Sequence, residues 1–388
     1  MMLIIQIKHM DESWNNRMKT VNQFKKLMYV IFLPVGLLLF FLSSSAPALT
    51  EKVYSNGIFK IIGQVLSLIT ALLPFSLAEF TIIFLVLFIL WNLIRIIIRM
   101  LKEKSRKWHI VLNFFINILA FASIIYFGFV ILWGLNYNRL PFSSIANLDV
   151  RPTSVKELAE VCENIIGRAN ELRSKVSENK EGVMYLPNGI GDALKRAYKG
   201  YENAAKLYPE LGGRYGRPKG VIFSKAMCYT GIEGVYFPFT AEANVNIAIP
   251  DSSIPSTTTH EMAHQRGFAR EDEANYIAYL TCSMHPDVDF QYSGTLLALI
   301  HTMNTLYDYD REQYNRLRTK YSKGVIRDLS AIREFWKQYE GPVENVSSSI
   351  NDAYLKANLQ RDGIYSYGRM VDLLIAEYRT KVSRPQIQ

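Results

Sequence analysis

The chain contains few cysteines and few histidines. Its 388 residues include only three cysteines and six histidines. Cys162, Cys228 and Cys282 form no CxxC pair, which argues against a cysteine-based metal site and limits a monomer to one disulfide. Cys282 falls on an apolar helix face, so we expect it to be a small buried residue. Because the chain has so few histidines, two histidines at helical spacing are an informative signal of a shared site.

Acidic residues are outnumbered by basic ones, giving a formal charge of +9. Much of the excess flanks long apolar runs, in the N-terminal segment 1–27 and in the stretch 95–107. Basic residues in such flanking positions set membrane topology. We therefore attribute the basicity to membrane orientation and expect no nucleic-acid partner.

Three runs are long enough to cross a bilayer, which needs roughly 20 apolar residues. They define a transmembrane region, residues 28–135, with spans at about 28–49, 80–100 and 108–133. The first run has too long an apolar core and too long a polar lead to be a cleavable signal peptide. Segment 57–76 is broken by Pro74, and we interpret it as an interfacial helix, with a re-entrant piece or a fourth span as alternatives.

The positive-inside rule gives the direction of these spans. It places segment 1–27 and the basic loop in the cytoplasm, so the third span leads outward. Residues 136–388 are then an extracytoplasmic domain. We expect a multi-pass protein of the cell membrane whose partners include the lipid bilayer.

The extracytoplasmic part predicts a mainly helical α+β domain with a small sheet. Helical periodicity begins at Val155 and recurs over about 190–207. Short β-branched and aromatic runs separated by glycine predict three strands, at 221–223, 234–237 and 244–249. From Asp289 onward the pattern is almost wholly helical.

A metal-binding motif follows the last predicted strand. The run His260-Glu261-Met262-Ala263-His264 is an HExxH sequence, which on a helix places both imidazoles one turn apart on one face. They can then bind one Zn²⁺ while Glu261 acts as general base. A pair of hydrogen-bonded core histidines is the competing interpretation.

The helix that carries this motif has start and stop signals. Ser252 and Ser253 can cap its beginning, and Pro255 suits its first turn. Gly267 permits the turn that ends it. A second helix is predicted from about 269 to 283.

The third metal ligand is a carboxylate in this next helix. Glu271 shares the inward-facing stripe with Asn275, whereas Glu273 lies on a neighbouring face and remains an alternative. Either residue could instead be a first-turn acid that the helix dipole stabilises. Arg270 stands where an HExxHxxGxxH pattern would have its third histidine, so that pattern is absent. Asn275 is predicted to hydrogen-bond a ligand histidine.

Other site residues are less constrained by the sequence. His285 and His301 are weaker ligand candidates. An oxyanion would need a donor besides zinc, and the candidates are Tyr229, Tyr365, Tyr367 and Arg369. Each tyrosine is one of 23, so packing is the competing role. Strand 244–249 could bind an extended peptide, although an internal strand fits equally.

The segment HEMAHQRGFAREDEANYIAYL, with SYGRMVDLL at 366–374, resembles the DUF3810 family of bacterial membrane proteins. The resemblance extends over nearly the whole chain, including Asn136-Tyr137-Asn138-Arg139 after the third span. That family is of uncharacterised function and is grouped with the gluzincin-like zinc peptidases, which implies a zincin-like fold. The Glu-x-Glu-Ala-Asn element is similar to the third-ligand helix of other gluzincins, where a Glu lies four residues before an Asp or Asn, which implies Glu271 as ligand and Asn275 as its partner. The interval from His264 to Glu271 is short for that pattern.

These observations favour a membrane-anchored zinc metallopeptidase that cleaves a peptide or protein substrate of the envelope. Glu261 would be its catalytic base, and Zn²⁺ its cofactor. The alternative is a non-catalytic metal-binding scaffold of the envelope, or a ligand-binding membrane protein. An intact Glu261 argues against that alternative, because a purely structural site needs no general base.

Overall fold

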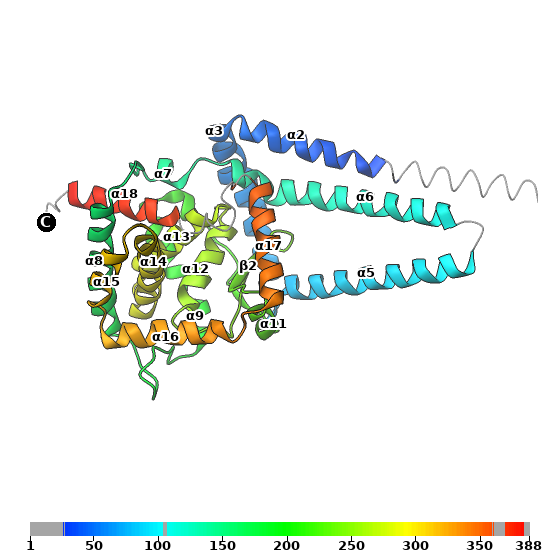
Figure 1. Ribbon diagram of the computed structural model, residues 1–388. Coiled ribbons are helices and arrows are strands. Elements are labelled where there is room, and N and C mark those ends of the chain that lie inside the picture. Colours follow the sequence, from blue (N-terminus) through cyan, green and yellow to red (C-terminus); the bar gives the residue numbers. More distant parts are fainter. Residues whose placement is uncertain (1–25, 27, 104–106, 359, 361–368, 384–388) are drawn as a thin grey trace, which may run out of the picture. The chain divides into compact units, whose positions relative to one another are not determined.

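The computed structural model describes residue 26 and residues 28–103, 107–358, 360 and 369–383. It divides into two compact units (Figure 1). The first comprises the described residues up to Ala46 together with Phe80–Leu135. The second comprises Pro47–Glu79 and the described residues from Asn136 onward. The expected membrane region 28–135 is therefore interrupted, since residues 47–79 pack with the later part of the chain.

The first unit is built from long apolar helices. Helix α2 (Phe32–Ser44) packs against α6 (Lys107–Leu132), where the rings of Phe32 and Phe127 lie 4.9 Å apart. Helix α5 (Leu77–Lys102) contributes Phe80–Lys102 to this unit and exposes large side chains such as Phe84 and Trp91. Exposed apolar surface on this scale is typical of helices that face lipid.

Helices α5 and α6 are each long and apolar enough to cross a membrane, and they match the expected spans 80–100 and 108–133. The expected first span, 28–49, is shorter in the structure, because the helix ends at Ser44 and Pro47 starts another. Three serine hydroxyls donate to helix carbonyls there, at Ser43, Ser44 and Ser45. A third candidate span within the described residues exists only if Met28–Ser44 and Pro47–Thr70 are taken as one bent pair.

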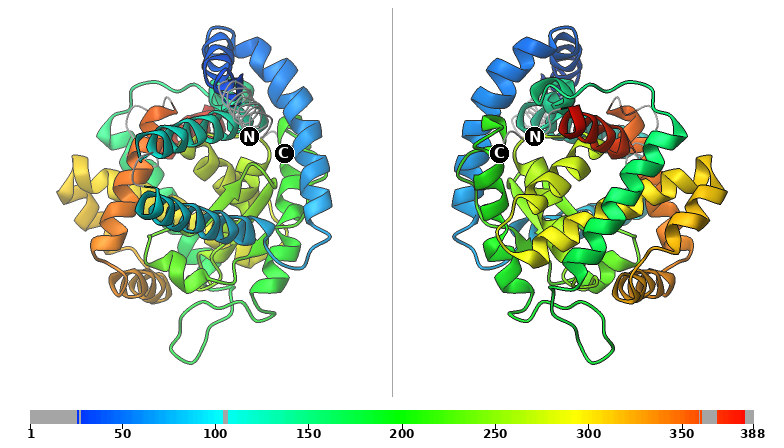
Figure 2. Two further views of the ribbon diagram at one scale, coloured as in Figure 1. Left: turned by 90° about the vertical axis from the view of Figure 1, so that its right-hand side faces the viewer. Right: turned by 90° about the vertical axis from the view of Figure 1, so that its left-hand side faces the viewer.

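Segment 47–79 forms α3 (Pro47–Leu49), the π-helix η1 (Thr50–Phe59) and α4 (Lys60–Thr70). Helix α4 is amphipathic. Its Gly63, Ser67 and Thr70 are buried, whereas Ile61 and Val65 are more than half exposed. Figure 2 shows this blue helix at the periphery of the second unit. An exposed apolar face is typical of a helix at a membrane interface, and the interfacial interpretation of segment 57–76 stays a prediction.

A buried ion pair fastens this segment to the rest of the second unit. Both oxygens of Glu51 accept hydrogen bonds from Arg139, at 2.6 and 2.9 Å. The guanidinium of Arg139 also lies 3.8 Å from the centre of the Phe268 ring. Arg139, which follows the third apolar helix, therefore binds Glu51 and Phe268, each more than 80 positions away in the chain.

The remainder of the second unit is mainly helical. After the 3₁₀ helix η3 (Gly134–Asn138), its first helices are α7 (Phe142–Ile145), α8 (Val155–Arg173), α9 (Ile190–Arg196) and α10 (Tyr198–Ala204), then the 3₁₀ helix η4 (Pro209–Leu211) and α11 (Ser224–Cys228). The later ones are α12 (Ile254–Gln265), α13 (Glu271–Ser283), α14 (Val288–Tyr309), α15 (Arg311–Arg318), α16 (Lys323–Lys337), α17 (Pro342–Ala357) and α18 (Met370–Ser383). The hydroxyl of Ser154 caps α8 by accepting from the Glu157 N–H, as expected of a serine before a helix.

The sheet has three short strands in the order β1-β3-β2. Strand β3 (Glu242–Val245) pairs in parallel with β1 (Lys219–Gly220) and antiparallel with β2 (Gly234–Phe237). The strand expected at 221–223 is a turn instead. The carboxylate of Glu79 accepts the N–H groups of Ile222 and Phe223, so those groups do not donate to the sheet.

Helix α12 occupies the centre of this unit. It contacts β2 and β3 as well as α9, α13 and α14, and of its twelve residues only His260 is not buried (Figure 1). The three cysteines are also buried, and each is a free thiol. A helix surrounded in this way holds its side chains in fixed positions, which favours a precise site.

Candidate metal centre

The local sequence positions the HExxH helix. Pro255 lies in the first turn of α12, as expected, and Gly267 ends the helix with a φ of +83°, a value that glycine adopts without strain. Ser253 precedes the helix, but its side chain makes no capping hydrogen bond. The sharp turn at Gly267 allows Glu271, the first residue of α13, to face back toward α12.

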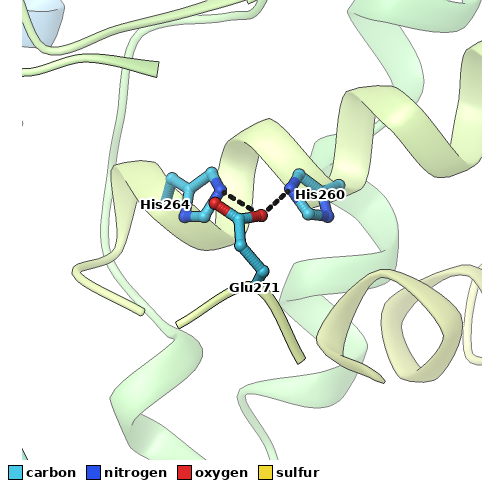
Figure 3. A group of neighbouring side chains, drawn as sticks. All are labelled: His260, His264 and Glu271. Carbon is cyan, nitrogen blue, oxygen red and sulfur yellow. Dashed lines mark ion pairs between the residues drawn. The ribbon is translucent and has the colours of Figure 1, made fainter. Parts of the chain in front are cut away.

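Three side chains converge after that turn. One carboxylate oxygen of Glu271 lies 3.2 Å from Nε2 of His260 and 3.5 Å from Nε2 of His264 (Figure 3). The two imidazole rings are 4.7 Å apart and nearly perpendicular. All three potential ligand atoms fall within 4.8 Å of one another.

These separations suit a zinc ion. Zinc–ligand distances of about 2.0–2.2 Å in a tetrahedron place neighbouring ligand atoms about 3.3–3.6 Å apart. The two carboxylate–imidazole distances, 3.2 and 3.5 Å, are close to that range. Two imidazole nitrogens and one carboxylate oxygen are also the donor set that zinc accepts while keeping a fourth position open. The short interval between His264 and Glu271 therefore does not prevent the three groups from meeting.

A backbone carbonyl orients one of the imidazoles. Nδ1 of His264 lies 2.7 Å from the carbonyl oxygen of Phe268, just past the Gly267 turn. An N–H donated there leaves Nε2 as the lone-pair nitrogen that faces Glu271. In the metal-free protein, burial lowers the pKa of His264, but the neighbouring Glu271 carboxylate outweighs it and raises that pKa to about 9.

The opposite effect acts on Glu271. Burial alone would raise its pKa, but the charges and hydrogen bonds of His264 and His260 hold it well below its ordinary value. The metal-free cluster is therefore an anionic carboxylate beside an imidazolium. A divalent cation that displaces the proton of His264 would take over the pairing with the Glu271 carboxylate and add one positive charge to the cluster.

The Glu261 carboxylate is buried in a confined space beside the histidines. Burial raises its pKa to about 7, although the adjacent histidines oppose the increase. The Tyr236 backbone contributes a hydrogen bond to it, while Oε2 has no partner. A Cβ on Gly234 would lie 2.5 Å from the other oxygen, so β2 passes too closely for any larger residue. A buried carboxylate with one unpaired oxygen and a pKa near neutrality suits a general base.

The structure separates the two alternative carboxylates. Glu273 points away from the histidines, and its Oε1 accepts from the Phe142 N–H at 2.8 Å and from Arg270 at 2.7 Å. Glu271 is the residue that joins the histidine pair. Asn275 is buried one turn farther along α13, and its hydrogen bond to a ligand histidine stays a prediction.

The other candidates have different surroundings. His285 is buried against Phe290 and lies 3.0 Å from the Arg196 carbonyl. Tyr229 is more than half exposed and contacts the ring of Tyr339. Tyr365 and Tyr367 lie outside the described residues. Burial raises the pKa of the Asp272 carboxyl, and the nearby positive charge of Arg369 partly offsets that increase.

Sequence reasoning missed Glu233 and did not place His301, a weaker ligand candidate, near His260. The Thr257 hydroxyl donates to Glu233 at 2.8 Å, and His260 is close enough to lower the pKa of that buried carboxyl, which burial raises. Burial, together with the charge of His260, lowers the pKa of His301 to about 4, so this imidazole is neutral at pH 7. No motif connects these residues, since strand β2 and helix α14 bring them to His260 only through the fold.

A family model described as a protein of unknown function (DUF3810) matches residues 54–375, well over half of the chain. The chain belongs to the DUF3810 family. The resemblance carried by the HEMAH and SYGRMVDLL segments is thus confirmed at the level of the family. No curated protein and no solved structure matches the chain. The match includes every residue of the DUF3810 histidine–glutamate cluster.

Proposed function

We propose that this DUF3810 protein is a zinc-dependent peptidase anchored in a membrane. The observation that carries the proposal is the convergence of His260, His264 and Glu271 beside a buried, half-unpaired Glu261. A purely structural zinc site has four protein ligands and no use for such a carboxylate. Bound zinc would supply a water molecule of lowered pKa and would polarise the carbonyl of the substrate.

Glu261 performs the proton transfer in this proposal. Its unpaired Oε2 accepts a proton from the attacking water and later returns it to the leaving amine. The Tyr236 N–H donates to the Glu261 carboxylate and holds it in place. Gly234 has no side chain and therefore leaves room for that carboxylate beside β2. The fixed orientation of His264 by the Phe268 carbonyl prevents that ligand from turning away.

Strand β2 offers a place for the substrate backbone. Within the described ranges it is an edge strand whose one neighbour is β3, and it begins beside Glu261. An extended peptide can add to such an edge through main-chain hydrogen bonds. The free edge of β2 suits this better than the internal strand β3, which covers part of the expected strand 244–249.

The topology belongs to the same proposal. The basic loop between α5 and α6 lies in the cytoplasm by the positive-inside rule, so the peptidase unit is extracytoplasmic. Its fold is zincin-like in having an HExxH helix beside a small sheet, and its substrates would be peptides or proteins of the envelope.

Two measurements on the purified full-length protein test the activity. Metal analysis is expected to find one zinc per chain, and His260→Ala is expected to lose it. Cleavage of a mixed peptide library, followed by mass spectrometry, is expected to fall roughly 100- to 10,000-fold in Glu261→Gln, the range typical of a missing general base. Zinc should remain bound in that variant, because Glu261 is no ligand.

Glu160→Gln is the matched control, since Glu160 is an exposed residue of α8 outside the cluster. It should retain both zinc and cleavage. If Glu261→Gln cleaves peptides as fast as the unaltered protein, Glu261 is not the base and the peptidase proposal is wrong.

A further inference from the structure

A cavity lies on the side of α12 that is opposite the histidines. It encloses about 570 Å³ and is lined by residues of α9 and α10, of the loop from Leu211 to Pro218, and by Met262 and Arg266. Met262 and Arg266 follow His260 and His264 by two positions each, which is about 200° around a helix. The metal cluster and this basic cavity therefore occupy opposite faces of one helix.

Arg266 is a buried cation that forms no ion pair with any carboxylate in the part of the chain that the structure describes. Only 5% of it is exposed, and its guanidinium lies between the rings of Tyr201 and Tyr215, at 3.8 and 4.6 Å. It donates to the carbonyls of Leu211 and Met262. Among the described residues, no acceptor bonds its second terminal nitrogen, which leaves N–H donors of the fork unused.

The entrance of the cavity adds more positive charge. Lys195, Arg214 and Arg217 line it and are exposed, and no carboxylate in the described part of the chain pairs with them. With Arg266 there are four basic residues against one acidic residue, Glu202, a net formal charge of +3. A planar guanidinium at the floor and flexible cations at the entrance suit a phosphate group.

The cavity wall is attached to the amphipathic helix α4. The Arg214 N–H donates to the side-chain oxygen of Gln64 at 2.6 Å, and the Gly216 N–H donates to the Ser67 hydroxyl at 3.1 Å. Helix α4 turns Ile61 and Val65 outward and precedes α5 by only a few residues. A helix with such a face lies at the level of the lipid headgroups.

From these contacts we propose that the basic cavity binds the phosphate headgroup of an anionic phospholipid. The phosphate takes the unused N–H donors of Arg266. Lys195, Arg214 and Arg217 neutralise the remaining charge, and tyrosine rings such as Tyr198 contact the apolar part of the headgroup region. The attachment to α4 favours a lipid over a soluble phosphate compound, because it places the cavity wall against the interfacial helix.

The test uses the full-length protein, stripped of lipid in detergent and titrated separately with phosphatidylglycerol and phosphatidylcholine. Native mass spectrometry then counts the lipids retained. Phosphatidylglycerol is expected to bind roughly 10- to 100-fold more tightly than phosphatidylcholine, because both lipids offer a phosphate but the choline cation is repelled by the net charge of +3 in the cavity. Arg266→Lys keeps the charge but loses the planar fork that donates to the phosphate, and it should weaken phosphatidylglycerol binding about tenfold or more.

A charge-matched pair of double variants separates the site from general electrostatics. Arg214→Gln with Arg217→Gln alters the cavity entrance without disturbing any buried residue, and it should weaken phosphatidylglycerol binding about tenfold or more. Arg333→Gln with Lys337→Gln removes the same charge from the exposed face of α16 and should have no effect. Thermal unfolding of each variant identifies any that fails to fold.

Two results would overturn the proposal. One is a failure of the expected differences, either equal retention of the two lipids by the unaltered protein or unchanged phosphatidylglycerol binding in both Arg266→Lys and the entrance double variant. The other is displacement of phosphatidylglycerol by glycerol phosphate or inorganic phosphate at an equal concentration, which would assign the cavity to a soluble phosphate compound.

Discussion

The two faces of α12 have opposite electrostatic character. On one face Glu261 and Glu271 meet a pair of histidines, and every cation of the cluster is a titratable imidazole. On the other face Arg266 is held by carbonyl oxygens and tyrosine rings, with no carboxylate bonded to it among the described residues. One helix can thus present an environment for a metal cation on one face and one for an anion on the other. Helical periodicity places residues two positions apart on opposite faces.

The largest expected effect is the loss of the carboxylate ligand. Glu271→Ala should weaken zinc binding more than the roughly 10- to 100-fold that loss of a partner outside the ligand shell costs. Competition with a chelating dye measures this affinity. Phosphatidylglycerol binding on the opposite face should be unchanged. Zinc binding that matches that of Glu160→Gln would show that Glu271 is not a ligand.

A smaller effect is expected at the strand that confines Glu261. In Gly234→Ala the new methyl group would overlap a Glu261 oxygen, so the base must move. Displacement of a catalytic group by about 1 Å can lower the rate roughly 100-fold, so kcat for peptide cleavage should fall by that order with zinc retained. Val235→Ala is the control, because Val235 is an exposed residue of the same strand. Equal kcat values in the two variants would contradict the assigned role of Gly234.

The pH dependence of zinc binding follows from His264. Its metal-free pKa, raised to about 9, means that the imidazole is protonated at neutral pH and must lose that proton when zinc binds. The apparent affinity should therefore rise about tenfold per pH unit up to pH 9 and then level off. Calorimetry in buffers of different ionisation enthalpy would detect one proton released at pH 7. Zinc binding that is independent of pH between 6 and 8 would contradict it.

The smallest effect is expected at His301. This imidazole is already neutral at pH 7, because burial and the charge of His260 lower its pKa to about 4. His301→Gln therefore changes no charge, and zinc affinity should change by less than about tenfold. A larger loss, measured with the same chelating dye, would make His301 part of the ligand set.

The sequence was a good guide wherever the information is local. The spacing of His260 and His264, the proline in the first turn of α12 and the glycine at its end are all features of neighbouring residues. Each of them predicted its element correctly. The two long apolar helices were predictable for the same reason, since length and composition suffice.

Features that depend on distant partners were not predictable. The apolar run Val221–Phe223 has strand-forming residues, yet Glu79, more than 140 positions earlier, accepts the N–H groups of Ile222 and Phe223. The choice between Glu271 and Glu273 was decided by the Phe142 N–H, which fixes Glu273 elsewhere. Helical or strand periodicity predicts which face a residue occupies, but it does not predict which distant atom will contact that residue.

The ion pair of Glu51 with Arg139 has a consequence for dissecting the molecule. A fragment that begins after the third apolar helix would keep the arginine, buried to 2% exposure, and discard its carboxylate. Removing one member of a buried ion pair lowers the free energy of unfolding by about 3–5 kcal/mol, which is a large share of the stability of an ordinary domain. Expression of residues 136–388 by themselves should therefore yield insoluble material unless residues 47–79, which contain Glu51, are included.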